Sequence, residues 1–208
     1  MEQNCLFQKG SLRIYLQSLI ATAEKDILAL SEKDLAQDKI EPIVSRISTK
    51  CSLKIPVLLE GDMRMESSPT SIRIVANDDG YSRNKRQDTF IEGTKIKIII
   101  PYTGTKELFF HRPNTNWQNF PQGDVVQNEL QLTYYVRPGV HTTEQVEREY
   151  KNAVIGIKKL LSDVEKDIAN HAQVLVNTIN SALATRRAYF QTTQNFISEL
   201  ENKLKPKN

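Results

Sequence analysis

The last third of the chain decides its fold, and residues 142–205 read TTEQVEREYKNAVIGIKKLLSDVEKDIANHAQVLVNTINSALATRRAYFQTTQNFISELENKLK. This stretch contains no proline and one glycine, Gly156. Apolar or small residues recur along it at positions 146, 150, 154, 157, 161, 164, 168, 172, 175, 179 and 183, and again at 190, 193, 197, 200 and 204. The mean period of about 3.6 residues per turn is that of a nearly straight α-helix, and a heptad coiled coil has about 3.5. The stretch therefore predicts an amphipathic helix.

The ends of this helix and one weak point inside it are also visible. Thr142 and Gln145 have the spacing of a capping box, and Pro206 ends the pattern. Asn177, Asn180 and Ser181 are poor helix formers and predict a break that leaves helices over residues 143–178 and 182–204. The alternative is one unbroken helix, about 93 Å long, whose distal half pairs in an oligomer. In either case the helix needs a second surface, in its own chain or in another.

The middle of the chain, residues 50–139, changes to a period of two. Lys95-Ile96-Lys97-Ile98 alternates cleanly, as a half-buried strand does. Gly104 lies in a PYTGT sequence that predicts a tight turn with a residue of positive φ. Strands are expected at residues 53–60, 71–77, 94–101, 107–112 and 129–136. These strands predict an antiparallel sheet of about five strands, with polar connections at residues 78–88 and 113–128.

The N-terminal zone, residues 11–48, again has a helical period. Ser11 is expected to be the N-cap of the first helix, and Ser31 with Asp34 restarts the pattern in the manner of a capping box. Pro42 predicts two short pieces or a kink in the second helix. The expected fold class is therefore α+β, with N-terminal helices over residues 1–49, an antiparallel β domain over 50–139, and a long helix or helical hairpin over 140–205.

Composition excludes several classes of protein. The chain has 208 residues, 39% of them apolar, and 28 Lys and Arg against 25 Asp and Glu, a net charge of +3. No apolar run approaches the length of a membrane span, since residues 98–100 are stopped by Pro101, and no signal peptide is recognisable. Cys5 and Cys51 match neither a disulfide framework nor a zinc motif. We expect a cytoplasmic protein that does not contact membranes.

The chain lacks a recognisable catalytic constellation. His111, His141 and His171 have no partners at metal-ligand spacing, and no Gly-x-Ser-x-Gly elbow is present. The two Gly-Thr-Lys tripeptides, at residues 93–95 and 104–106, lack the upstream glycine of a phosphate-binding loop. We therefore expect a protein that is not an enzyme and that binds no metal and no cofactor.

Two groups of residues are candidates for binding. Residues 83–117 carry an excess of positive charge and several aromatics, so they form either a nucleic-acid surface or, as we favour, a solvated sheet face. Arg186-Arg187 either pairs with carboxylates of a partner helix or is exposed to solvent. Phe109 and Phe110 cannot both face solvent on one strand, so at least one belongs to the core. The candidate binding residues are Arg83, Lys85, Arg86, Tyr102, Arg112, Trp117, Arg186 and Arg187.

A series of short motifs follows in a fixed order along the chain: FIEGT at residues 90–94, IPYTGTKELF at 100–109, RPNT at 112–115, ELQL at 129–132, NSAL at 180–183 and Arg186-Arg187. Together these motifs resemble an uncharacterised N-terminal module of bacterial anti-phage defence proteins. The resemblance covers residues 50–190. In that family the module precedes a C-terminal TIR or restriction-endonuclease-like effector domain.

The resemblance implies a regulatory, sensing or assembly role next to an effector, and it supplies no catalytic residue. No effector sequence follows Pro206, so we expect the effector to lie in another chain or beyond a truncation. The function expected is that of a non-catalytic module of a bacterial anti-phage defence system. Its expected partners are an effector protein or domain and a second copy bound through residues 143–204. The alternative is a nucleic-acid-binding subunit that uses residues 83–117.

Overall fold

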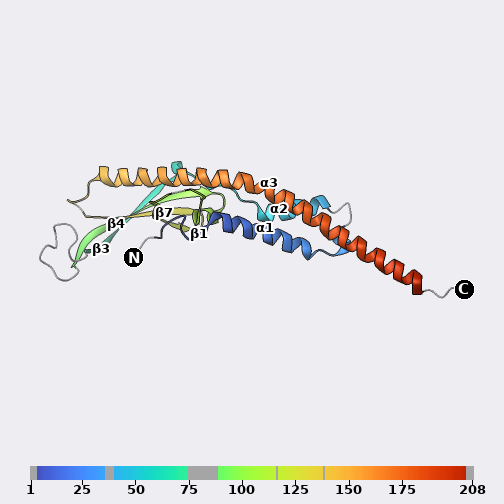
Figure 1. Ribbon diagram of the computed structural model, residues 1–208. Coiled ribbons are helices and arrows are strands. Elements are labelled where there is room, and N and C mark those ends of the chain that lie inside the picture. Colours follow the sequence, from blue (N-terminus) through green and yellow to red (C-terminus); the bar gives the residue numbers. More distant parts are fainter. Residues whose placement is uncertain (1–3, 36–39, 75–88, 116, 138, 205–208) are drawn as a thin grey trace. The chain divides into compact units, whose positions relative to one another are not determined.

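The computed structural model describes residues 4–35, 40–74, 89–115, 117–137 and 139–204. Over these residues the fold is α+β, with three α-helices and a five-stranded antiparallel sheet, and the predicted fold class is confirmed (Figure 1). The chain divides into two compact units. The sheet unit comprises Met1–Ser11 and Lys54–Val164, and the helical unit comprises Leu12–Leu53 and Glu165–Asn208. These boundaries differ from the three zones of the sequence, because α3, Thr143–Leu204, contributes residues to both units.

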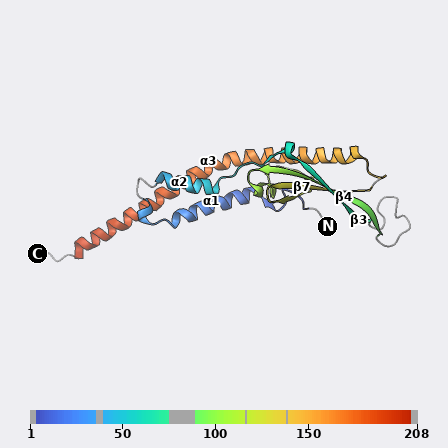
Figure 2. The same ribbon diagram turned by 180° about the vertical axis from the view of Figure 1, so that it is seen from behind.

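The sheet is built around its longest strand. This strand, β4 (Thr89–Thr103), pairs with β3 (Arg64–Ile74) and β2 (Val57–Leu58) along one edge and with β7 (Glu129–Val136) along the other. The β6 strand, Asp124–Val126, pairs with β7 on the outside. In both views the first part of α3 runs alongside this sheet (Figure 2). The buried apolar residues of the unit come from the sheet, the turns around it and α3, and include Leu6, Phe7, Ile98, Ile99, Ile100, Leu108, Phe109, Leu130, Leu132, Val154, Ile157, Leu160, Leu161 and Val164.

The predicted strand over residues 107–112 is wrong. Lys106–Phe109 forms a 3₁₀ turn, η4, and only β5, His111–Arg112, is extended. Because both edges of β4 are already occupied by β3 and β7, the segment cannot return as its hairpin partner. It instead pairs in parallel with β1, Gly10–Ser11. The prediction for Gly104 is confirmed, since its φ is +100° and its backbone lies against Ile55.

The helical unit begins with α1 (Leu12–Leu28), the 3₁₀ turn η1 (Glu32–Leu35) and α2 (Ile40–Cys51). Ser31 donates hydrogen bonds from its backbone N and its Oγ to the Asp34 carboxylate, at 3.0 and 2.6 Å, so the predicted restart at this point is confirmed. The segment forms two pieces, η1 and α2, as predicted, but the division does not fall at Pro42. Pro42 lies in the first turn of α2, where a helix has no N–H donor to lose.

The predicted break in α3 is also wrong. The helix runs from Thr143 to Leu204 through Asn177, Asn180 and Ser181. Its start is as predicted, since Thr142 N donates to Gln145 Oε1 at 2.9 Å and Gln145 N donates to Thr142 Oγ1 at 3.3 Å. The unbroken helix of the alternative is the one observed.

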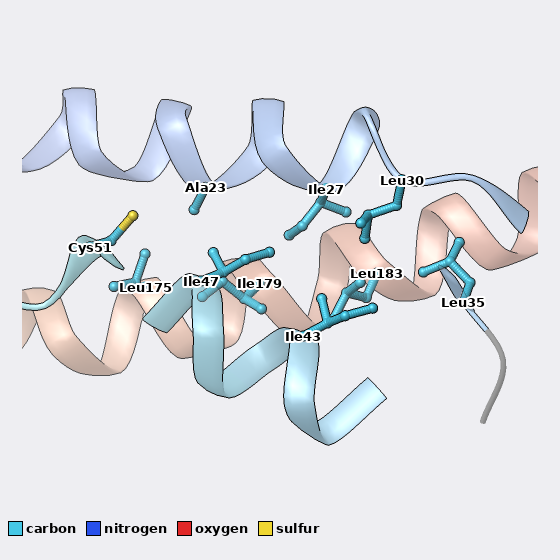
Figure 3. Packing of buried hydrophobic residues seen from close by; sticks show 10 residues of the cluster. All are labelled: Ala23, Ile27, Leu30, Leu35, Ile43, Ile47, Cys51, Leu175, Ile179 and Leu183. Atoms are coloured by element: carbon cyan, nitrogen blue, oxygen red, sulfur yellow. The ribbon is translucent and has the colours of Figure 1, made fainter. Parts of the chain in front are cut away.

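Packing explains why α3 does not break at its weak point. Figure 3 shows side chains of α1, α2, η1 and α3 meeting in the core of the helical unit. The buried members of this core are Ala23, Ile27, Leu30, Leu35, Ile43, Ile47, Cys51, Leu175, Ile179 and Leu183. Ile179 lies between Asn177 and Asn180, and Leu183 follows Ser181 by two residues. Burying such an apolar side chain contributes about 1.5–3 kcal/mol. This exceeds the propensity penalty of the asparagines and the serine, which is below about 0.7 kcal/mol each.

Candidate binding face of the helical unit

The helical unit contains an open groove between α1 and α3. Its volume is about 790 Å³, and none of its lining residues comes from α2. The α1 wall is formed by Glu24 and Leu28. The α3 wall is formed by residues at steps of three and four along one side of the helix: Val174, Asn177, Thr178, Ser181, Ala182, Thr185, Arg186 and Tyr189. The groove is thus a strip several turns long, lined mostly by apolar and small side chains.

Large apolar side chains project from the walls and from the same helix further on. Leu28 is 64% exposed, Val174 49% and Tyr189 59%. Beyond the end of the groove, Phe196 is 65% exposed and Leu204 73%, and Ile197 and Leu200 are also exposed. The apolar residues predicted at helical spacing over residues 190–204 are therefore present. Phe190 still packs at the margin of the core, and the apolar side chains that follow it on this stripe are exposed.

Arg186 and Arg187 are held by their own unit. Arg186 donates from Nε and Nη2 to the carbonyl oxygen of Leu30, at 3.3 and 3.1 Å. Its guanidinium lies 4.5 Å from the ring centre of Phe190, which adds a cation–π contact. Arg187 donates from Nε to the carbonyl oxygen of Leu35 at 3.2 Å. These two cations bind carbonyls that follow α1 and end η1, where a helix leaves such acceptors without intrahelical partners.

Tyr102, a predicted binding residue of the sheet unit, lies in the core of that unit. Tyr102 is 3% exposed, donates its hydroxyl to the Gln127 carbonyl at 2.9 Å, and meets Phe109 edge to face. Burial raises the pKa of Tyr102. Because its ring is covered, it offers no face for stacking on a base. Phe109 is fully buried, so the prediction that at least one of the two phenylalanines belongs to the core is confirmed.

The remaining candidates of that region also have partners within the unit, where they are described. Arg112 lies 5.4 Å from the ring centre of Phe120. Trp117 donates from Nε1 to the Asp163 carboxylate at 3.3 Å, and the Lys159 ammonium lies 5.1 Å from its ring centre. The long aromatic connection thus packs on the first part of α3. Arg83, Lys85 and Arg86 lie outside the described residues.

A second groove, of about 700 Å³, lies in the sheet unit. It is bounded by the side chains of β3 and β4 and by the first turns of α3, and Met63, Met65, Val146 and Tyr150 contribute to it. Burial raises the pKa of Tyr150. The groove is apolar, and Arg64 at its margin is paired with Glu129 at 2.8 Å. Nothing in the sequence pattern pointed to it, because β3 starts in a stretch rich in serine.

The α1–α3 groove is marked in the sequence by a lack of charged residues, which the spacing of the apolar residues does not reveal. Within residues 168–198 the only Asp, Glu, Lys or Arg side chains are Arg186 and Arg187. The preceding part of α3 is densely charged, at Glu144, Glu147, Arg148, Glu149, Lys151, Lys158, Lys159, Asp163, Glu165, Lys166 and Asp167. A helix that is exposed on one side to water usually carries charges there, and the cores of protein interfaces are depleted of them.

Among the residues that the structure describes, no three His, Cys, Asp or Glu side chains lie close enough together to hold a metal ion. None of the described helices combines the length and the apolar character that crossing a membrane requires. Comparison of the chain with protein-family models, with curated proteins and with solved structures gives no match.

Proposed function

We propose that this protein is a non-catalytic assembly module that binds another protein chain through the α1–α3 groove of its helical unit. The observation that carries the proposal is an exposed side of α3 with large apolar side chains and almost no charge, next to a groove lined mostly by apolar and small side chains. Surfaces of this composition are typical of protein interfaces, because water-exposed apolar side chains gain free energy when a partner covers them.

Two further observations support a binding role for this side of the unit. Arg186 and Arg187, the only charges within residues 168–198, are engaged with carbonyls of Leu30 and Leu35. A partner that covers this surface therefore buries few charged groups that lack a hydrogen-bond partner, so the desolvation cost of binding is small. The groove is also pre-formed, so little conformational entropy is lost when a helix enters it.

The wider role stays a prediction from the sequence resemblance. A module of anti-phage defence proteins that regulates or assembles a TIR or nuclease effector needs a surface for a protein partner, and the groove supplies a candidate. A cytoplasmic location belongs to the same proposal.

Site-specific photo-crosslinking in the cells that make the protein tests the proposal. A benzophenone amino acid is introduced at Leu28, on the wall of the groove, and as a matched control at Ile155 of α3, which is 62% exposed against 64% for Leu28. We expect covalent adducts with a protein chain, either a second copy or another protein, at Leu28 and few at Ile155. Equal or absent crosslinking at the two positions would contradict a binding role for the groove.

A further inference from the structure

We infer that the partner in the groove is a second copy of this chain, with the two α3 helices antiparallel and their two-fold axis at Thr185. The inference rests on the proposed function and names its partner. Thr185 lines the groove, and the exposed aromatic residues follow it along the helix.

The residues that would form such a dimer lie on one side of α3. At 3.6 residues per turn, eleven positions of the helical unit between residues 167 and 203 fall within an arc of about 80°. They are Asp167, His171, Val174, Thr178, Ser181, Thr185, Tyr189, Thr192, Phe196, Glu199 and Lys203, and His171 among them is buried. We call this set the pairing face. Five of its members line the groove, and Tyr189 and Phe196 are the exposed aromatic side chains on it.

The pairing face is divided into a hollow half and a filled half. Before Thr185 the face is lined by the smaller residues of the groove, and from Tyr189 onward it presents aromatic rings. A two-fold axis at Thr185 sets Tyr189 of one copy opposite Ser181 of the other, and Phe196 opposite Val174. Each aromatic ring of one copy then enters the groove of the other. The contact is isologous, as expected for a two-fold dimer.

Charges at the ends of the face favour the same arrangement. Antiparallel pairing about Thr185 sets Asp167 of one copy opposite Lys203 of the other, so that opposite charges meet at both ends. Glu199, which pairs with Lys203 within its own copy at 3.4 Å, then lies opposite the buried, neutral side of the face at His171. The charge-poor residues 168–198 lie between these ends, and their midpoint at position 183 is close to the axis. A parallel pair would instead oppose Asp167 to Asp167, Lys203 to Lys203 and Phe196 to Phe196. Like charges and two large rings would meet while the hollows stayed empty.

The contact is long enough to be stable. Between Asp167 and Lys203 the helix rises by about 54 Å. The alternative of pairing through the last turns alone would cover only the apolar side chains from Phe196 to Leu204. The longer register also covers Leu28, Val174 and Tyr189, which are exposed along the groove.

Distances between spin labels on the full-length chain test the geometry. Labels are attached to Ala184→Cys and, separately, to Asn202→Cys, two exposed positions beside the pairing face. The background carries Cys5→Ser, and Cys51 is buried, with a pKa raised by that burial, so it does not compete for the label. In the antiparallel dimer, the labels of the two copies are expected to lie less than about 25 Å apart at position 184. At position 202 they are expected to be separated by about 51 Å along the helix axis. Short distances at both positions indicate a parallel pair and overturn the inference, and so does the absence of any dipolar coupling.

Light scattering on two charge variants tests the contact itself. Phe196→Glu places a carboxylate in the opposing groove and is expected to weaken dimerisation at least about tenfold. Ile155→Glu, at an equally exposed apolar residue outside the face, is expected to leave it unchanged. Equal effects of the two variants would overturn the inference. If the chain is monomeric while Leu28 crosslinks to a different protein, the dimer is excluded and the proposed binding role stands.

Discussion

Arg186 joins three parts of the helical unit at the scale of a single residue. Its guanidinium binds the Leu30 carbonyl twice, lies over Phe190, and forms part of the groove wall. Sequence reasoning selected this residue as a candidate for binding another chain. The structure places it where it also secures the end of α1, so a change at Arg186 affects stability as well as any interface.

The first prediction concerns this anchoring role. Arg186→Ala removes two hydrogen bonds from a charged donor and a cation–π contact, so we expect the free energy of unfolding to fall by about 1–3 kcal/mol. Urea denaturation followed by circular dichroism measures the change. Arg148→Ala, at an exposed position of α3, serves as the control and should change stability by less than about 0.5 kcal/mol. Equal effects would show that Arg186 is not an anchor.

The second prediction concerns His171, which is buried in the helical unit. Burial lowers its pKa in the folded protein below the ordinary value of 6.5, and its Nε2 has no hydrogen-bond partner among the described residues. The folded state thus binds fewer protons than the unfolded state once the pH falls below about 6.5, so stability is lost as the pH decreases. We expect His171→Leu to reduce the loss of stability between about pH 7.5 and pH 5.5, as measured by urea midpoints. An unchanged pH dependence would contradict this role.

At the scale of secondary structure elements, α3 shows what a local pattern can and cannot predict. The apolar spacing and the capping box at Thr142 fix where the helix starts and which side is buried. The expected break followed from propensity alone, and it fails because Ile179 and Leu183 are anchored by α1 and α2. Tertiary packing of this kind depends on residues far away in the sequence, so a window around Asn180 does not contain it.

The third prediction separates propensity from packing at this weak point. Ile179→Ala leaves a cavity in the core and should lower the free energy of unfolding by about 2–5 kcal/mol. Its neighbour Asn180 is exposed, and Asn180→Ala should raise stability by about 0.5 kcal/mol through better helix propensity. Thermal and urea unfolding of the two variants measure both signs. If Asn180→Ala had the larger effect, the packing explanation would be wrong.

At the scale of the whole molecule, the sequence predicted the α+β class, the long helix and the strand at Glu129–Val136. It did not predict that α3 is shared between two units, nor the strand β6, nor the turn at Lys106–Phe109. Those features depend on which edges of β4 are already paired and on long-range packing, and neither is encoded in local periodicity.

The sequence predicted a partner surface on α3 but not the position of the groove. Apolar periodicity marks the buried stripe of α3, and it led to the expectation of a partner surface. The groove lies on a neighbouring side of the same helix, where serine, threonine and alanine carry little periodic signal. The better guide was the near absence of charge between Asp167 and Glu199, a long stretch for a helix with an exposed side.

Sedimentation equilibrium of the unmodified chain, over protein concentrations from about 1 to 100 µM, tests the central claim most directly. The protomer mass is 23.8 kDa. Pairing through the charge-poor side of α3 predicts an apparent mass that rises toward twice this value with concentration, and that stays near the protomer mass in Phe196→Glu. A mass of 23.8 kDa at every concentration, or a dimer that Phe196→Glu leaves intact, would contradict it.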